Sequence, residues 1–424
     1  MHDASANPTH TRRSRTRVKV NRRSLLSGLA AGLGMAALDT PLAHAGAVRK
    51  TPHRGTSGQI TNFAVMFNPS GLLGETQGDQ GYFEQLLKAA LVPPLSEVAI
   101  YAHGWLTDAN NLMLIYNTLV QGYGAVQREL RRAPSLAVPT SALGITTHWP
   151  SRRGENLEGP ADFLDVLTFP TMEARANFVG TMGMARLIGD IWDRLLADPE
   201  LASTRLHLVG HSFGCRVLCS ALHTLPLKVP HAFMALQARN PIDLVLLQPA
   251  MPYDALEPND LAHAHPFAQL VNYQNLRILT TMSQWDHPLV RFYPAVEGQQ
   301  PNDAVYARAP AGTRNAVPAL GGAGPTDATW KAFNGDLPRT TIPIGPGFRH
   351  GDIIAQPGQR LVVADLTPLH AAHHREDMAR PAGQLPPFGR PDKGSMSLSG
   401  YHTDLYCKEI YHLDIGFAYG QREI

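Results

Sequence analysis

The 424-residue sequence has few cysteines, few charged residues and no long hydrophobic run. Three cysteines leave at least one thiol unpaired, which excludes a small scaffold stapled by disulfides. Charged residues make up 17% of the chain and hydrophobic residues 44%, a balance typical of a folded globular protein. No apolar run reaches the roughly eighteen residues that a membrane-spanning helix needs. The composition therefore predicts a globular chain with a sizeable core.

Motifs for nucleotides and metals are also missing. No GxGxxG or phosphate-binding loop occurs, so we expect no nucleotide cofactor. Cys215 and Cys219 lie four residues apart, without a further Cys or His at zinc-finger spacing. We expect them to be small buried residues on one face of a helix rather than metal ligands.

One other group of side chains could bind a metal: His370, His373, His374, Glu376 and Asp377. Their spacing matches no established metal motif, so we interpret the group as part of a solvated loop. We expect neither a metal nor any other cofactor.

The first 45 residues resemble an export signal. A basic stretch at 12–23 precedes a short apolar run at 25–38, and Ala43-His44-Ala45 is typical of a signal-peptidase site. Arg22-Arg23 followed by Ser-Leu-Leu resembles a twin-arginine signal. A basic nucleic-acid-binding tail and an uncleaved membrane anchor are the alternatives. We expect cleavage after Ala45, the twin-arginine translocation machinery as a partner during export, and a bacterial periplasmic or secreted protein.

Most of the positive charge belongs to this signal. Residues 1–45 hold seven Lys and Arg against two Asp and Glu, a balance of +5, whereas the whole chain carries +2. The remainder therefore carries about −3, and no nucleic-acid partner is expected.

Short runs rich in Val, Ile and Leu alternate with helical patterns along residues 46–424. The expected strands are 61–67, 97–102, 144–149, 205–209, 242–248, 276–281 and 360–365. The expected helices are 81–91, 108–132, 174–197, 213–225 and 403–418. Continuous apolar strands separated by helices predict an α/β fold whose mostly parallel central sheet is flanked by helices.

Two Gly/Pro-rich stretches interrupt this alternation. They lie before and after the last expected strand, at about 294–358 and at 371–400. We interpret the first as an insertion and the second as a long loop, both within a single domain over 46–424.

Ser212 lies in the sequence Gly-His-Ser-Phe-Gly, between an expected strand and an expected helix. That context is the one in which such a serine becomes a nucleophile on a sharp turn. Gly210 and Gly214 would leave room for the turn, and the positive end of the following helix would favour a developing negative charge. A serine that merely caps the helix is the alternative.

Strand-His-Gly-Trp, strand-GHSFG-helix and then an Asp and a His, in that order, resemble the α/β-hydrolase superfamily on the lipase and esterase side. The resemblance covers most of residues 60–424, although only the serine turn and the His-Gly pair are specific. It implies the α/β-hydrolase fold, a Ser-Asp-His triad and an oxyanion hole. By this likeness Trp105 and Phe213 would donate backbone N–H groups to the oxyanion, and His103-Gly104 would hold the turn in shape.

The family places its acid after a late strand. Asp286 follows the expected strand at 276–281, where it could orient an imidazole. Asp254, which follows the preceding strand, is the second candidate, and an ordinary surface-turn aspartate is the third possibility.

The family's histidine usually lies in a loop before the last helix, which favours His402. His370, a few residues past the strand at 360–365, is the alternative. Asp286 and His402 are 116 residues apart, more than the family usually needs. The two Gly/Pro-rich stretches would account for the excess.

Taken together, the sequence predicts an exported serine hydrolase that cleaves small-molecule or lipid carboxylic esters through an acyl-enzyme on Ser212. A cofactor-free perhydrolase using the same triad is one alternative. A non-catalytic binding protein of the same fold is the other.

Overall fold

The computed structural model covers most of the region expected to fold. It describes residues 48–50, 59–68, 71, 84–85, 87–105, 107, 115, 118–119, 121–126, 129, 141–151, 169–228, 241–260, 264–294, 317–353, 356–391, 393 and 396–420. The expected export signal at 1–45 lies outside the described residues. Among the helices in these ranges, none combines the length and the hydropathy required to cross a membrane.

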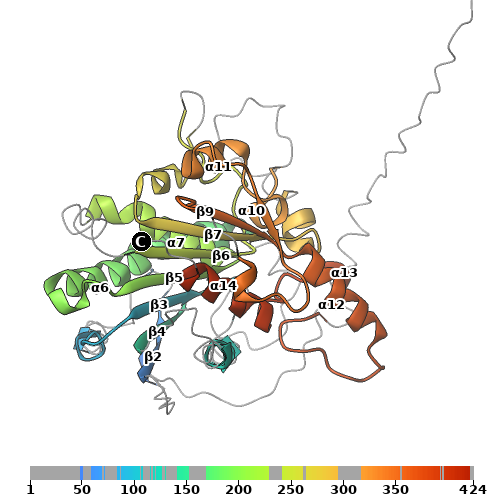
Figure 1. Ribbon diagram of the computed structural model, residues 1–424, viewed down its shortest axis with the longest axis horizontal. Coiled ribbons are helices and arrows are strands. Elements are labelled where there is room, and N and C mark those ends of the chain that lie inside the picture. Colours follow the sequence, from blue (N-terminus) through green and yellow to red (C-terminus); the bar gives the residue numbers. More distant parts are fainter. Residues whose placement is uncertain are drawn as a thin grey trace, which may run out of the picture.

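A single sheet organises the fold. Nine strands of the described residues form it in the order β1-β2-β4-β3-β5-β6-β7-β9-β8 (Figure 1). Their bounds are β1 Val48–Lys50, β2 Gln59–Met66, β3 Glu97–Ala102, β4 Ser141–His148, β5 Arg205–His211, β6 Ile242–Leu247, β7 Leu276–Met282, β8 Thr341–Pro343 and β9 Leu361–Asp365. β1 is antiparallel to β2, and all other neighbours are parallel. Eight strands therefore end at the same edge.

The seven strands predicted from apolar runs are all present, and their bounds differ from the prediction by only a few residues. β1 and β8 were not predicted. Each is three residues long and neither has a continuous Val, Ile or Leu run, so a pattern of buried residues cannot reveal them. The chain thus has the α/β fold expected, with an almost entirely parallel sheet.

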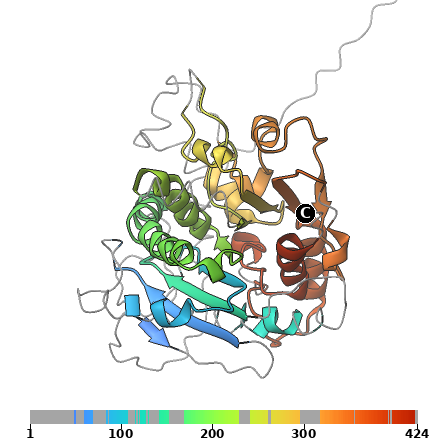
Figure 2. The ribbon, with the colours of Figure 1, turned by 60° about the vertical axis from the view of Figure 1, so that its left-hand side comes forward.

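Helices cover both faces of this sheet. The longer ones are α5 Phe169–Val179, α6 Ala185–Ala197, α7 Phe213–Lys228, α11 Asp327–Asn334, α12 Thr367–Ala379 and α14 Lys408–Tyr419; α10 Leu320–Ala323 and α13 Met396–Ser399 are single turns. In β6, Leu244 and Leu246 belong to the core beneath α5, α6 and α7, whereas Val245 and Leu247 belong to the core beneath α14. Figure 2 shows these two helical layers on either side of the sheet. Because successive side chains of a strand point to opposite faces of the sheet, each strand contributes to both cores.

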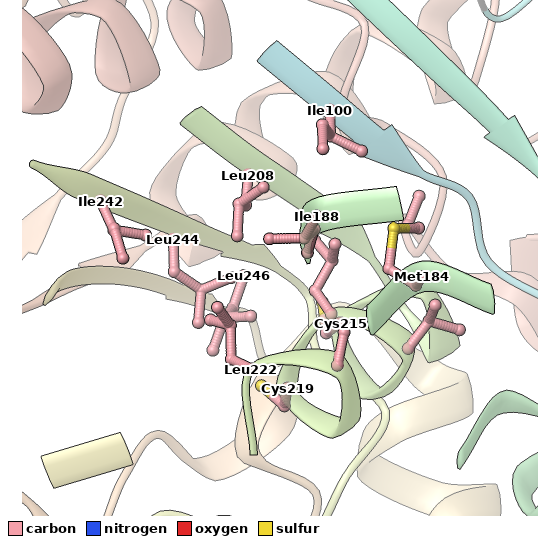
Figure 3. Close-up of a cluster of buried hydrophobic side chains, with 14 of the residues drawn as sticks. Ile100, Met184, Ile188, Leu208, Cys215, Cys219, Leu222, Ile242, Leu244 and Leu246 are labelled. Carbon is pink, nitrogen blue, oxygen red and sulfur yellow. The ribbon is translucent and has the colours of Figure 1, made fainter. Parts of the chain in front are cut away.

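The core on the α7 side is closely packed with aliphatic side chains. Figure 3 shows Leu208, Leu244 and Leu246 of the sheet gathered with Cys215 and Cys219 of α7. Both thiols are free and buried, as expected for small residues on the inner face of a helix. This packing fixes the start of α7 against the end of β5.

The helix predicted over 174–197 is interrupted. A π-helical turn, η1 at Gly180–Met184, separates α5 from α6. A Cβ at Gly180 would lie 2.4 Å from the carbonyl oxygen of Val217, so this turn packs closely against α7. The extra residue of a π turn rotates the face of the helix. Phe178, just before the turn, is 48% exposed, whereas Leu187 and Ile188 after it are fully buried.

The two Gly/Pro-rich stretches contain regular structure that the sequence did not predict. In the first, residues 317–353 form α10, α11 and the edge strand β8 beside β9. In the second, the expected loop at 371–400 begins with nine residues of α12 and includes the turn α13. The interpretation of 371–400 as a loop was therefore wrong for residues 371–379.

Candidate active site

Ser212 lies in a sharp turn between β5 and α7, in a backbone conformation that most side chains avoid. Its φ is +54°, within the left-handed region. A Cβ at Gly214 would lie 2.0 Å from the carbonyl oxygen of Ala102, and one at Gly210 would lie 2.7 Å from the backbone nitrogen of Cys215. Because both contacts are with backbone atoms, only glycine fits on either side of the serine. The turn holds Ser212 at the carboxyl edge of the sheet.

Three side chains distant in sequence form a hydrogen-bonded chain at this edge. His402 Nε2 lies 2.9 Å from Ser212 Oγ, and His402 Nδ1 lies 2.7 Å from Asp286 Oδ2. An ionised carboxylate can only accept, so the Nδ1 proton of His402 points to Asp286. Nε2 is then left to accept a hydrogen bond from the Ser212 hydroxyl. The structure therefore brings together the three residues selected from the sequence.

Asp286 is fixed from the side opposite to the imidazole. It follows β7 and is fully buried. Its second oxygen, Oδ1, accepts a hydrogen bond from the backbone N–H of Leu289 at 3.0 Å. With both oxygens engaged, the carboxylate presents one fixed acceptor to His402.

His402 lies in a turn before α14, which begins at Lys408 and not at residue 403 as predicted. The preceding residues contact the loop that carries Asp286: Tyr401 N–H donates to the carbonyl oxygen of Trp285 at 3.0 Å. At Gly400, where φ is +50°, a Cβ would lie 2.1 Å from that same oxygen. Direct backbone contact between the two loops therefore sets the position of the imidazole relative to the carboxylate.

His211 also contacts the histidine loop, a role that the sequence did not reveal. Its Nε2 donates to the carbonyl oxygen of His402 at 3.0 Å, and the two rings lie 4.9 Å apart. Burial lowers the pKa of His211 to about 3, so its ring is neutral over the physiological range. Its place next to Ser212 in the motif was the only signal, and that signal does not say which backbone it meets.

The His103-Gly104 turn lies directly against Ser212. Ala102 pairs with Gly210 in the sheet, so the two chains leave β3 and β5 side by side. A Cβ at Gly104 would lie 2.8 Å from the Cβ of Ser212. His103 hydrogen-bonds through Nδ1 to the carbonyl oxygen of Gly104 at 2.6 Å.

His103 is held on its other side by Trp149. Its Nε2 accepts the backbone N–H of Trp149 at 3.2 Å, and the two rings stack at 5.6 Å. Burial lowers the pKa of His103 well below its usual value, so the ring is neutral and both nitrogens serve the turn. This geometry fits the shape-holding part that the sequence suggested for His103.

The two residues expected to stabilise an oxyanion flank the serine. Phe213 is the first residue of α7, so its backbone N–H is one of those that an α-helix leaves without an internal acceptor. Trp105 follows the His-Gly turn, and its ring lies 6.3 Å from that of Phe213. The positive end of α7 adds to this side of the site. Phe213 is buried, whereas Trp105 is partly exposed.

The alternative candidates lie elsewhere. His370 hydrogen-bonds through Nδ1 to Ser283 at 2.8 Å, not to Ser212. Asp254 lies 3.7 Å from the imidazole of His265. The geometry thus selects Asp286 over Asp254 and His402 over His370.

The suspected metal group after β9 proved to be helical. His370, His373 and Asp377 are buried on α12, so the expectation of a solvated loop was wrong. Helical spacing turns these side chains inward, which a search for metal spacing cannot detect. Within the residues that the structure describes, no cluster of three or more His, Cys, Asp and Glu side chains is arranged to hold a metal ion.

Comparisons of the chain with protein-family models, with curated proteins and with solved structures found no match. The function must therefore be argued from the geometry of this site.

Proposed function

We propose that this chain is a serine hydrolase that cleaves carboxylic esters, built on an α/β-hydrolase fold. The observation that carries the proposal is the hydrogen-bonded chain Ser212–His402–Asp286, with distances of 2.9 and 2.7 Å. The left-handed backbone at Ser212 supports it, since strained conformations of this kind cluster at functional sites. A parallel sheet flanked by helices is common to several α/β folds, so the site, not the sheet, supports the superfamily assignment.

In the first half of the proposed reaction, Ser212 Oγ attacks the carbonyl carbon of the ester. His402 Nε2 takes the hydroxyl proton as the new C–O bond forms, because a neutral serine is a poor nucleophile. Asp286 holds the imidazole in the tautomer whose Nε2 is free to accept and stabilises the imidazolium that results.

The tetrahedral intermediate carries its negative charge on the former carbonyl oxygen. Backbone N–H groups of Trp105 and Phe213 would donate to this oxygen, beside the positive end of α7. The loss of one such donor typically costs about 3 kcal/mol of transition-state stabilisation. His402 then gives its proton to the leaving alcohol as the ester C–O bond breaks.

In the second half, water replaces the alcohol. His402 takes a proton from water as its oxygen attacks the acyl carbon of the acyl-enzyme. Collapse of the second tetrahedral intermediate breaks the bond to Ser212, whose oxygen regains the proton from His402. The products are a carboxylic acid and the alcohol, and the chain returns to its starting state. No cofactor takes part in these steps.

The proposal is tested by labelling with a fluorophosphonate probe, which phosphonylates an activated serine. The wild-type chain should be labelled and should hydrolyse short p-nitrophenyl esters, and Ser212→Ala should do neither. Ser220→Ala is the matched control, because Ser220 is a buried serine of α7 that is hydrogen-bonded to Asn177 and lies outside the site. Absence of labelling in well-folded wild-type chain would contradict the proposal and favour a binding protein. Ester turnover compared with peracid formation in added peroxide separates the hydrolase from a perhydrolase.

We also propose that residues 1–45 direct twin-arginine export, so that the chain acts in the bacterial periplasm or outside the cell. Support comes from the Arg22-Arg23 pair, the apolar run at 25–38 and the site ending at Ala45. Replacement of both arginines by lysine should abolish export, and the exported product should begin at Gly46. An exported product that retains residue 1 would contradict cleavage.

A further inference from the structure

Helix α12 carries polar side chains on the face that a core helix usually gives to apolar ones. His370, His373, His374 and Asp377 recur at positions i, i+3, i+4 and i+7, which places them on one face. Three of them are at most 5% exposed. Buried polar groups are costly unless they are paired, so their partners should explain why the helix has this face.

Part of this face contacts the loop that carries Asp286, which we call the acid loop. Ser283 Oγ accepts the backbone N–H of Trp285 at 3.1 Å and is hydrogen-bonded to His370 Nδ1, 2.8 Å away. The ring of Trp285 lies 4.5 Å from that of His374. Burial lowers the pKa of His370 to about 4, so this contact is a neutral hydrogen bond near pH 7. Both contacts are within three residues of Asp286.

The rest of the face contacts the loop that carries His402, which we call the base loop. His373 Nδ1 donates to Asp404 Oδ2 at 2.5 Å, and the hydroxyl of Tyr401 donates to Asp377 Oδ2 at 3.0 Å. Tyr401 and Asp404 stand on either side of His402 in the sequence. The ring of Tyr401 also stacks on that of His370 at 5.5 Å.

The helix is anchored where it meets this loop. Asp377 forms ion pairs with Arg380, one turn further along the chain, and with Arg390 at 3.5 Å. Arg390 Nε also lies 3.7 Å from Asp404 Oδ1. The polar face of α12 is therefore a paired network and not a set of isolated charges.

We propose that helix α12 positions the catalytic histidine, by holding the acid loop and the base loop at a fixed separation through one continuous polar face. The inference rests on the proposed function, which makes His402 the general base. Tyr401, Asp404, His373 and Asp377 are positioning residues, since none of them contacts Ser212. The helix lies between Asp286 and His402 in the sequence, so part of the long segment that separates them serves to hold them in place.

The sharpest test is Tyr401→Phe, which removes one hydroxyl and leaves the ring in place. It should lower kcat by about tenfold to a hundredfold with KM within about twofold, because a small displacement of a catalytic group has effects of this size. Tyr273→Phe is the matched control: Tyr273 is as deeply buried, and its hydroxyl donates to Leu222 at 2.5 Å on the other side of the sheet. The control should retain the wild-type kcat.

A second pair of variants tests the other anchor. Asp404→Ala should lower kcat as Tyr401→Phe does, whereas Asp404→Asn, which retains an oxygen for His373, should recover most of it. A double-mutant cycle then identifies the route. In a His402→Ala background, Tyr401→Phe should cause no further loss of residual turnover, because a positioning residue has nothing left to position.

The results that would overturn the inference are distinct from those that would overturn the proposed function. Wild-type kcat in both Tyr401→Phe and Asp404→Ala would overturn it, as would an equal loss in the His402→Ala background. If Asp404→Ala fails to fold, as judged by thermal unfolding, Tyr401→Phe decides alone. Absence of fluorophosphonate labelling at Ser212 of the wild type would overturn both proposals. Normal labelling with unaffected variants would overturn only this one.

Discussion

The two edges of the sheet each hold a buried cluster of charged side chains, yet they differ in what remains available for chemistry. Strand β5 joins them, since Arg205 is its first residue and Ser212 follows its last. At the amino edge, a fully buried carboxylate is paired with two guanidinium groups. At the carboxyl edge, a hydroxyl, an imidazole and a carboxylate form one hydrogen-bonded chain, and its imidazole is partly exposed.

At the amino edge the opposite charges are paired with one another. Asp243 is fully buried and pairs with Arg205 and with Arg277, whose Nη2 lies 2.7 Å from its Oδ1. Burial alone would raise the pKa of Asp243, but the guanidinium groups of Arg277 and Arg205 outweigh it and the pKa is lowered. Both arginines also donate to the carbonyl oxygen of Ala418, at the end of α14, where cations are favourable.

At the carboxyl edge the chain of hydrogen bonds runs from Asp286 through His402 and ends at the Ser212 hydroxyl. The His402 side chain is 14% exposed, Ser212 is 4% exposed and Asp286 is fully buried. The polarity of the site is therefore fixed from within, and the imidazole is the part of the chain that is most exposed. Buried charge by itself therefore does not mark a catalytic site. A hydroxyl held beside an imidazole whose other nitrogen meets a fixed carboxylate does.

The largest effect on activity is expected from a substitution at the carboxyl edge. Asp286→Asn should lower kcat by about a thousandfold to ten-thousandfold, because the amide favours the wrong imidazole tautomer. The free energy of unfolding should change little, since an amide oxygen can still accept from Leu289. Ester kinetics and urea unfolding of the same preparation check both parts, and near-wild-type turnover would remove Asp286 from the triad.

Asp243→Ala should show the opposite pattern. It leaves two guanidinium groups without their counter-ion, and breaking a buried ion pair in this way costs about 3–5 kcal/mol. The folded fraction should retain its kcat, because Asp243 lies at the far end of the strands. Urea unfolding measures the loss of stability, and active-site titration corrects the kinetics. A stable Asp243→Ala chain would mean that the two edges differ less than the ion pairs suggest.

Gly214→Ala, at the carboxyl edge, should lower both stability and kcat. The added Cβ would lie 2.0 Å from the carbonyl oxygen of Ala102, so β3 and α7 must separate, at a cost of about 1–3 kcal/mol. The same shift displaces the N–H of Phe213, so kcat should also fall. Gly345→Ala is the matched control, since a Cβ there meets nothing within 4 Å. Equal behaviour of the two variants would show that the serine turn tolerates a side chain.

The smallest effect concerns pH at the amino edge. Burial lowers the pKa of His207, beside Asp243 and Asp414, to about 4, whereas a histidine in the unfolded chain titrates near 6.5. The unfolded state then binds more protons, so the free energy of unfolding should fall by about 1–2 kcal/mol from pH 7 to pH 5 through this group. His207→Gln should show a correspondingly smaller fall, measured by urea unfolding at both values. Identical pH dependence in the two chains would contradict this.

Much of the fold could be predicted because its signals are local. A run such as Ile-Asp-Leu-Val-Leu-Leu in β6 is buried on both faces, and such runs located seven strands. Where an element depends on its neighbours, prediction failed. Residues 371–379 of α12 were predicted to be a loop because they were grouped with a Gly/Pro-rich stretch and carry several polar side chains. Those side chains are paired with Ser283, Tyr401 and Asp404, which only the folded structure brings near.

Much of the serine turn was determined by the sequence itself, because the contact that requires glycine at 210 is with Cys215, five residues along the chain. The need for glycine at 214 comes from Ala102 on β3, so it depends on the tertiary structure. The choice of His402 over His370 was decided only by the tertiary structure. Partners separated by 190 and 116 residues meet only after strand order and loop paths are set. Hydrogen bonds reach about 3 Å, so no pattern along the chain can establish them before the sheet has brought its ends together.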